Sequence, residues 1–153
     1  MDFYYIQDDY INYLRQFDKN VSINKHETRP YVGIVLTVNY MDYFAPLTSP
    51  KQKHKKMKNS IDYRKIDGGL LGAINLNNMI PVVKDALIPI IINNVSDKNY
   101  KRLLQKQYDE IKKDENQIKN NAKRLRDIIV SNDTKLTDHY IQVKTRCCNL
   151  VLL

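Results

Sequence analysis

The stretch YVGIVLTVNYMDYFAPL, from Tyr31 to Leu47, decides the fold class. Its first eight residues are mostly β-branched or apolar, which is typical of a strand in the middle of a sheet. Asn39 to Asp42 form a short link that suits a tight turn, and the chain then becomes apolar again up to Leu47. We therefore expect the two apolar runs to pair as an antiparallel hairpin.

Further strand signals lie on both sides of this hairpin. We expect short strands over residues 3–6, 61–66, 70–76, 79–83 and 86–92. Asp67, Gly68 and Gly69 are a hairpin turn signal, and Pro81 and Pro89 favour edges or bends. So many short strands in succession predict a small antiparallel sheet or barrel.

Helical periodicity marks the remaining elements. Residues 9–17 predict a helix, and a longer one is expected from Lys98 to Val130, with a break near Asn120 and Asn121. We expect this long helix to pack against the sheet rather than form a coiled coil, because the seam positions Gln107, Asp114 and Asn121 are polar. Residues 138–153 predict a last helix or strand that docks on the core. The expected class is α+β, with residues 1–153 as a single domain.

Composition narrows the classes of function. The chain has 153 residues and a formal net charge of +8, which favours an anionic partner, either nucleic acid or a membrane surface. Its apolar runs are too short to cross a bilayer, and its start lacks a basic region before an apolar run, so we expect a cytoplasmic protein. The adjacent Cys147 and Cys148 and the scattered histidines predict no disulfide framework, no metal site and no cofactor.

The segment after the hairpin is the candidate for function. Thr48 and Ser49 lie between Pro46 and Pro50, which restrict the backbone and hold two hydroxyls at a fixed edge. A lysine-dense loop with one histidine follows: Lys51, Lys53, His54, Lys55, Lys56 and Lys58. The positive electrostatic field of these side chains attracts phosphate, the commonest biological polyanion. The alternative is a surface hairpin whose lysines are merely solvated.

The order of several motifs resembles that of the ToxN/AbiQ family of type III toxins. The matching residues are Tyr31 to Val35, Tyr43 to Lys51, His54, Leu71, Gly72, Ile74 to Leu76, Met79 to Pro81, Tyr100, Lys101, Leu104, Gln107, Cys148 and Asn149. They cover nearly the whole chain, and Ala45 to Lys51 is the most specific part. The resemblance implies a compact, strongly bent antiparallel sheet, a partial barrel like that of the Kid/MazF toxins, with added helices.

The resemblance also implies an activity and a partner. Members of this family are metal-independent endoribonucleases that act in phage defence and cut RNA, often at adenine-rich sites, leaving a 2′,3′-cyclic phosphate and a 5′ hydroxyl. Their antitoxin is a repeated small RNA that folds as a pseudoknot and closes with the toxin into a ring-like assembly. The expected substrates are cellular and phage RNA, and neither DNA nor a membrane is expected as a partner.

The resemblance places Thr48, Ser49 and Lys51 at the scissile phosphate, with Arg29 nearby. Attack by a 2′-hydroxyl needs a proton acceptor, and the crowded phosphorane oxygens need donors and cations. Lys51 or Arg29 is expected to stabilise the developing charge, and Ser49 to position the 2′-hydroxyl or relay its proton. His54 is a further catalytic candidate, since its unperturbed pKa suits a general base, and the alternative is that it only contacts a base or a phosphate.

RNA binding is expected of Lys53, Lys55, Lys56 and Lys58, and Arg64 extends this group, with simple solvation as its alternative. The resemblance implies the same role for Tyr10. Tyr10 has an equally good interpretation as a core residue, because it lies at helical spacing. Two other functions stay open from the residues alone. One is a basic RNA-binding module without catalysis, and the other is a DNA-binding repressor, which the absence of helix-turn-helix spacing disfavours.

Overall fold

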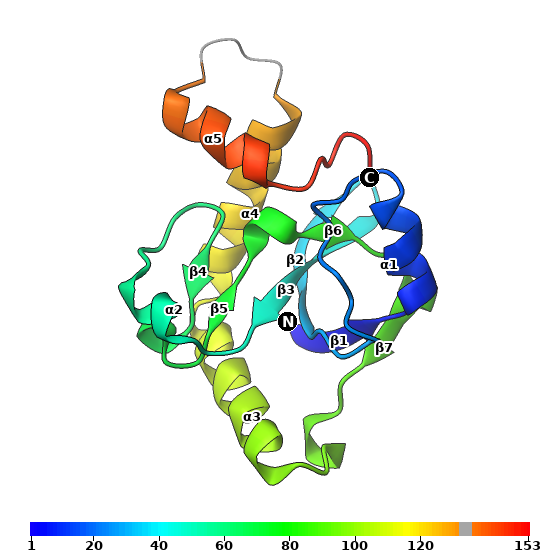
Figure 1. Cartoon of the computed structure of the whole chain (residues 1–153), viewed down its shortest axis with the longest axis vertical. Coiled ribbons are helices and arrows are strands. Elements are labelled where there is room, and N and C mark those ends of the chain that lie inside the picture. The colour runs from blue at the N-terminus through cyan, green and yellow to red at the C-terminus, as the bar shows by residue number, and fades with distance from the viewer. Residues whose placement is uncertain (132–135) are drawn as a thin grey trace.

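The computed structural model describes residues 1–131 and 136–153, and within them seven strands form one open antiparallel sheet (Figure 1). The strands are β1 (Asp2–Ile6), β2 (Tyr31–Val38), β3 (Met41–Thr48), β4 (Arg64–Lys65), β5 (Ala73–Ile74), β6 (Ile80–Pro81) and β7 (Leu87–Pro89). Their order is β4-β5-β3-β2-β1-β7, with β6 paired to β3. The predicted α+β class is confirmed. The sheet does not close on itself, since β4 and β7 are the two ends of the strand order.

The predicted hairpin is the centre of this sheet. β2 and β3 pair antiparallel from Tyr31 opposite Pro46 to Val38 opposite Met41. The turn residues Asn39 and Tyr40 have φ angles of 50° and 65°, the left-handed backbone that matches the twist of a hairpin. The sheet buries the largest side chains of the core, and α4 packs against β2.

The second predicted hairpin is present but much shorter than expected. β4 and β5 pair over two residues each, with a 3-10 turn, η1 (Asp67–Gly69), between them. Further short 3-10 turns are η2 (Leu76–Asn78), η3 (Lys84–Ala86) and η4 (Ile92–Asn94). Gly72 brings the chain very close to β3: its φ is +92°, and an added Cβ would lie 2.0 Å from the Thr48 carbonyl oxygen. Only glycine fits that approach, which sets β5 against the end of β3.

The helices are α1 (Asp8–Arg15), α2 (Gln52–Lys56), α3 (Lys98–Lys113), α4 (Glu115–Val130) and α5 (Asp138–Arg146). In Figure 1, α2 lies beside β4 and β5, whereas α1 lies at the other end of the sheet, near β7. None of the helices in the described part of the chain is long and apolar enough to cross a membrane.

The long helix breaks at a different place from the one expected. α3 and α4 meet at Asp114, whose φ and ψ are −101° and 7°, and α4 continues unbroken through Asn120 and Asn121. The Asp114 carboxylate accepts two hydrogen bonds from the Arg64 guanidinium, at 2.5 and 2.7 Å. This contact joins residues far apart in the sequence, so helical periodicity did not predict it.

The lysine-dense segment is also not simply a loop, because Gln52–Lys56 form the short helix α2. The His54 ring is 1% exposed, and its Nδ1 accepts a hydrogen bond of 3.0 Å from the Lys51 backbone N–H. The His54 backbone N–H in turn donates to the Lys51 carbonyl. The two bonds close a helical turn that composition alone does not indicate.

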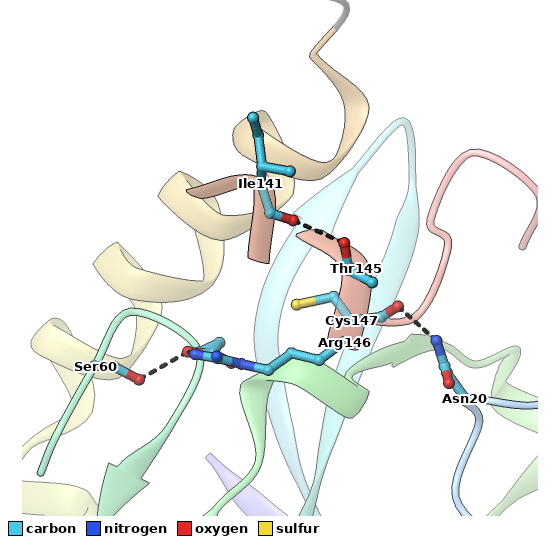
Figure 2. A network of polar contacts seen from close by, with 7 residues as sticks. Asn20, Ser60, Ile141, Thr145, Arg146 and Cys147 are labelled. Carbon is cyan, nitrogen blue, oxygen red and sulfur yellow. Dashed lines mark hydrogen bonds and ion pairs between the residues drawn. The ribbon is translucent and has the colours of Figure 1, made fainter. Parts of the chain in front are cut away.

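The C-terminal part docks through an ion pair as well as through apolar contacts. Leu150 is buried, whereas Val151 and Leu152 are exposed, so only part of the expected apolar docking is present. Arg146 extends from α5 toward Ser60 (Figure 2) and makes two hydrogen bonds, of 2.5 and 2.8 Å, to the buried Asp62 carboxylate. This pair fastens α5 to the segment just before β4.

Candidate functional site

Thr48 and Ser49 lie where β3 leaves the sheet, and the strand end is held from two sides. The Leu47 backbone N–H donates to the Pro30 carbonyl at 2.9 Å, and Thr48 is opposite Ala73 of β5. The Thr48 hydroxyl oxygen accepts a bond of 2.5 Å from the Asn75 side-chain amide. That bond leaves the hydroxyl proton of Thr48 free to be donated, and the exposed Ser49 hydroxyl has no partner among the described residues.

A cavity of about 650 Å³ opens at this strand end. It is lined by Tyr5, Ser22, Lys25, Thr28, Arg29, Pro30, Leu47, Thr48, Ser49, Lys51, Lys53, Asn75, Tyr100, Leu103 and Gln107. Four of these residues are cations, and no acidic residue of the described chain lines the cavity. The cavity therefore attracts an anionic group to the two hydroxyls.

Arg29 and Lys51 reach the cavity from different segments. Arg29 Nε donates to the Ile23 carbonyl at 2.9 Å, which fixes the guanidinium, and its terminal N–H groups have no partner within residues 1–131 and 136–153. Lys51 is exposed and stands at the start of α2. A planar guanidinium and a mobile ammonium are complementary donors for phosphate oxygens.

The structure does not bring His54 into this cavity. Its buried ring faces a second cavity of about 560 Å³, which is also lined by Thr48, Lys53, Lys58 and Asn75, among others. Burial, and then the charges of Lys53 and Lys51, lower the pKa of the imidazole below its ordinary value. Because His54 Nδ1 accepts a hydrogen bond from the Lys51 N–H, the main contact of this side chain stabilises the start of α2.

Four other predicted RNA-binding residues lie outside the two cavities. Lys55 and Lys56 are exposed on α2, and Arg64 is held by Asp114 beneath the junction of α3 and α4. Tyr10 packs against the core and donates its hydroxyl proton to the Pro81 carbonyl at 2.7 Å. Their binding roles stay predictions, and the structure gives Tyr10 and Arg64 a structural contact as well.

Sequence reasoning missed the part of the cavity wall that comes from remote segments. Tyr5 lies on β1, Asn75 follows β5, and Tyr100, Leu103 and Gln107 lie on α3. Two signals were available beforehand: Asn75, Tyr100 and Gln107 are among the residues that carry the family resemblance, and Gln107 is a polar residue at a seam position of the predicted helix. Nothing in the local sequence indicated that Asn75 bonds to Thr48.

The fold and the cavity together define a class of protein. Two hydroxyls beside several cations, with no acidic group of the described chain among them, suit a phosphodiester and the extra negative charge that builds up when it is attacked. The class is therefore a nucleic-acid-processing protein built on an open antiparallel sheet. Residues 2–153 match the family model of the toxin ToxN of type III toxin–antitoxin systems, and the chain belongs to this family.

Curated relatives agree with the family model. The chain is 33% identical over 140 residues to an endoribonuclease ToxN of Pectobacterium atrosepticum, covering 85% of this chain and 82% of the relative. It is 33% identical over 152 residues to an endoribonuclease ToxN of Bacillus thuringiensis subsp. kurstaki, covering 96% and 77%. The endoribonuclease AbiQ of Lactococcus lactis subsp. lactis is 33% identical over 131 residues, covering 78% and 70%.

Solved structures show the same fold. A type III toxin that is selectively inhibited by a non-coding RNA pseudoknot superimposes with a TM-score of 0.85 at 31% identity, covering 99% of this chain and 92% of that one. AbiQ, a lactococcal anti-phage endoribonuclease, superimposes with a TM-score of 0.81 at 29% identity, covering 99% and 92%. The predicted resemblance to the ToxN/AbiQ family is confirmed.

Proposed function

We propose that this endoribonuclease toxin cleaves single-stranded RNA in the cavity at the end of β3. A 2′-hydroxyl attacks the adjacent phosphate, the 5′-oxygen leaves, and the products carry a 2′,3′-cyclic phosphate and a 5′ hydroxyl. The observation that carries the proposal is the meeting of the Thr48 and Ser49 hydroxyls with Lys25, Arg29, Lys51 and Lys53 around one cavity. No step of this reaction requires a metal ion or another cofactor.

The contacts of each residue in the cavity support a different role in the proposed reaction. Thr48, whose oxygen is held by Asn75, donates its proton to a phosphorane oxygen. Arg29 and Lys51 offset the second negative charge that the phosphorane acquires. Ser49, whose hydroxyl has no partner among the described residues, positions the attacking 2′-hydroxyl or relays its proton.

The partners follow from the family and from the charge. We propose that a repeated small RNA folded as a pseudoknot binds and restrains the chain, closing with it into a ring, as the inhibition of a related toxin by an RNA pseudoknot supports. The uninhibited toxin then cuts cellular and phage RNA at adenine-rich sites in the cytoplasm and arrests growth of the infected cell. Residues 1–153 act as one domain, and the relation of its sheet to that of the Kid/MazF toxins stays a prediction.

Growth arrest on expression tests the proposal. The wild-type chain, expressed without its RNA, should arrest growth, whereas Ser49→Ala should not. Ser96→Ala, which changes an exposed serine outside the cavity, is the matched control and should arrest growth like the wild type. Equal toxicity of wild type and Ser49→Ala would contradict the role of Ser49. Tandem short repeats immediately upstream of the coding region are the expected source of the antitoxin.

A further inference from the structure

The part of the cavity wall that α3 forms differs in chemistry from the part that carries the cations. Tyr100, Leu103 and Gln107 are spaced three and four residues apart, so they share one face of α3, and all three line the cavity. Tyr5 adjoins them from β1, with its hydroxyl oxygen 3.2 Å from that of Tyr100. No charged side chain comes from α3 to the cavity within the described chain.

This wall is neutral and partly apolar. Burial, and then the hydrogen bond with Tyr5, raise the pKa of the Tyr100 phenol, so the ring stays uncharged at neutral pH. Leu103 is half-buried and lies outside the apolar core of the described residues, so its side chain is available to the cavity. Flat aromatic and apolar side chains are the surfaces on which unpaired bases stack.

The two chemically different parts of the cavity match the two parts of a nucleotide, which has an anionic phosphate at one end and a flat base at the other. The cations and hydroxyls suit the phosphate, and the α3 wall suits the base. The volume of about 650 Å³ lies within the range of roughly 300–1,000 Å³ that ligand sites span. The cavity therefore has room for a base next to the phosphate that is cut.

Gln107 is the polar group set into this wall. Its side chain is 3% exposed, and its Nε2 donates to the Leu71 carbonyl at 2.9 Å. That bond fixes the orientation of the amide, because a flipped amide would place two oxygens against each other. No described residue bonds Oε1, and Gln107 lines the cavity, so this oxygen is free to accept a hydrogen bond.

We infer that the α3 wall is a nucleobase subsite for one of the two nucleotides that flank the scissile phosphate, and that Gln107 determines its specificity. This inference rests on the proposed function. The base stacks on the wall formed by Tyr100 and Leu103, and its exocyclic amine donates to Gln107 Oε1.

The fixed amide selects a base by its edge. A glutamine amide pairs best with an edge that carries an exocyclic amine beside a ring nitrogen, as adenine does, and cytosine offers the same combination. A bound base that lacks the amine would cover the Gln107 oxygen without bonding to it, and an unsatisfied buried oxygen disfavours such a base. The subsite therefore prefers an amino-bearing base to one that lacks the amine.

The test uses short RNA substrates that differ by one functional group. At each nucleotide flanking the cleaved bond, adenosine is replaced by purine ribonucleoside, which lacks only the exocyclic amine. The value of kcat/KM is measured for the wild type, for Gln107→Met, which keeps length and loses the amide, and for Gln105→Met. Gln105 is exposed on another face of α3 and is the matched control.

The wild type should cleave the adenosine substrate about tenfold faster than the purine substrate at one of the two positions, because one buried hydrogen bond is lost. Gln107→Met should bring that ratio close to one, and Gln105→Met should keep it.

If the wild type cleaves the adenosine and purine substrates equally fast at both positions, the inference is overturned, whether or not Gln107→Met folds. An unchanged ratio in a folded Gln107→Met chain also overturns it. In both cases RNA is still cleaved and the proposed function stands. A wild type that cleaves no RNA overturns the proposed function, and the subsite with it.

Discussion

At the residue scale, the hydrogen bond from Asn75 to Thr48 leaves free the hydroxyl proton that we propose takes part in catalysis. The Thr48 oxygen accepts from Asn75, so its own proton is free to be donated, and Thr48 lines the cavity at the end of β3. A hydroxyl held in this way donates to a phosphorane oxygen without first having to turn. We therefore expect Thr48 to contribute to the transition state more than to binding.

Thr48→Val tests this role, because valine keeps the shape and removes the hydroxyl. We expect kcat to fall about 100-fold with little change in KM, the size of effect that follows loss of one oriented donor. Thr37→Val is the control: its hydroxyl bonds to Asp42 on the β2–β3 hairpin, away from the cavity, and its kcat should match the wild type. A proportional rise in KM with constant kcat would assign Thr48 to binding instead.

His54 makes stability depend on pH. Burial lowers its pKa in the folded chain, so the folded state favours the neutral ring, whose Nδ1 accepts from the Lys51 N–H. The stabilisation is fully present above the unfolded pKa of about 6.5 and decreases as pH falls from there toward the folded pKa. Between pH 7 and 5 the free energy of unfolding of wild type should fall relative to that of His54→Gln, as measured by urea denaturation. Parallel pH profiles would contradict this role.

At the element scale, the close approach of β5 to β3 depends on a single glycine. Gly72→Ala places a Cβ against the Thr48 carbonyl, so we expect a loss of about 3 kcal/mol or more in the free energy of unfolding. Gly68→Ala is the matched control, since Gly68 has a φ of +61° but nothing within 4 Å, and its cost should be about 1 kcal/mol. Equal costs for the two variants, measured by urea denaturation, would contradict the close approach.

The docking of α5 depends on Arg146. Although burial raises the pKa of the Asp62 carboxyl, the hydrogen bonds from Arg146 and Ser60 outweigh it and the pKa is lowered. Arg146→Met leaves the buried carboxylate without its main partner and should cost about 2 kcal/mol, a value reduced because the arginine is half exposed. Lys113→Met, which breaks an exposed pair with Glu110, should leave the midpoint of urea unfolding unchanged.

The elements show what local sequence can predict. The β2–β3 hairpin was predictable because alternation, β-branched residues and a tight link all lie within one stretch. The break between α3 and α4 was not, because it falls at Asp114, which is bound by Arg64 from another segment. The helix α2 was missed for a related reason: the buried His54 ring, and not propensity, closes its first turn.

At the scale of the whole molecule, the candidate site joins a predictable part to an unpredictable one. Thr48, Ser49 and Lys51 are neighbours in the chain, so one motif indicated them together. Tyr5 and Gln107 reach the same cavity from opposite halves of the sequence, and only the packing of β1 and α3 brings them there.

The charge around the cavity predicts a strong salt dependence of RNA binding. Each cation that neutralises a phosphate of single-stranded RNA adds roughly 0.7 to the slope of log affinity against log salt. In a Ser49→Ala background, in which we expect RNA to stay uncut, Lys51→Ala should reduce this slope by about that amount. Lys84→Ala removes an exposed lysine outside the cavity and should leave the slope unchanged. Equal slopes for all three chains would exclude Lys51 from phosphate contact.

Cleavage of RNA by 2′-hydroxyl attack in the cavity at the end of β3 is the reaction that we propose for this chain. The most direct measurement incubates the purified chain with adenine-rich single-stranded RNA in excess chelator and identifies the chemical ends of the products. Ends with a 2′,3′-cyclic phosphate and a 5′ hydroxyl, absent with Ser49→Ala, are the predicted result. Intact RNA that is bound but not cut, or ends with a 5′ phosphate and a 3′ hydroxyl, would contradict it.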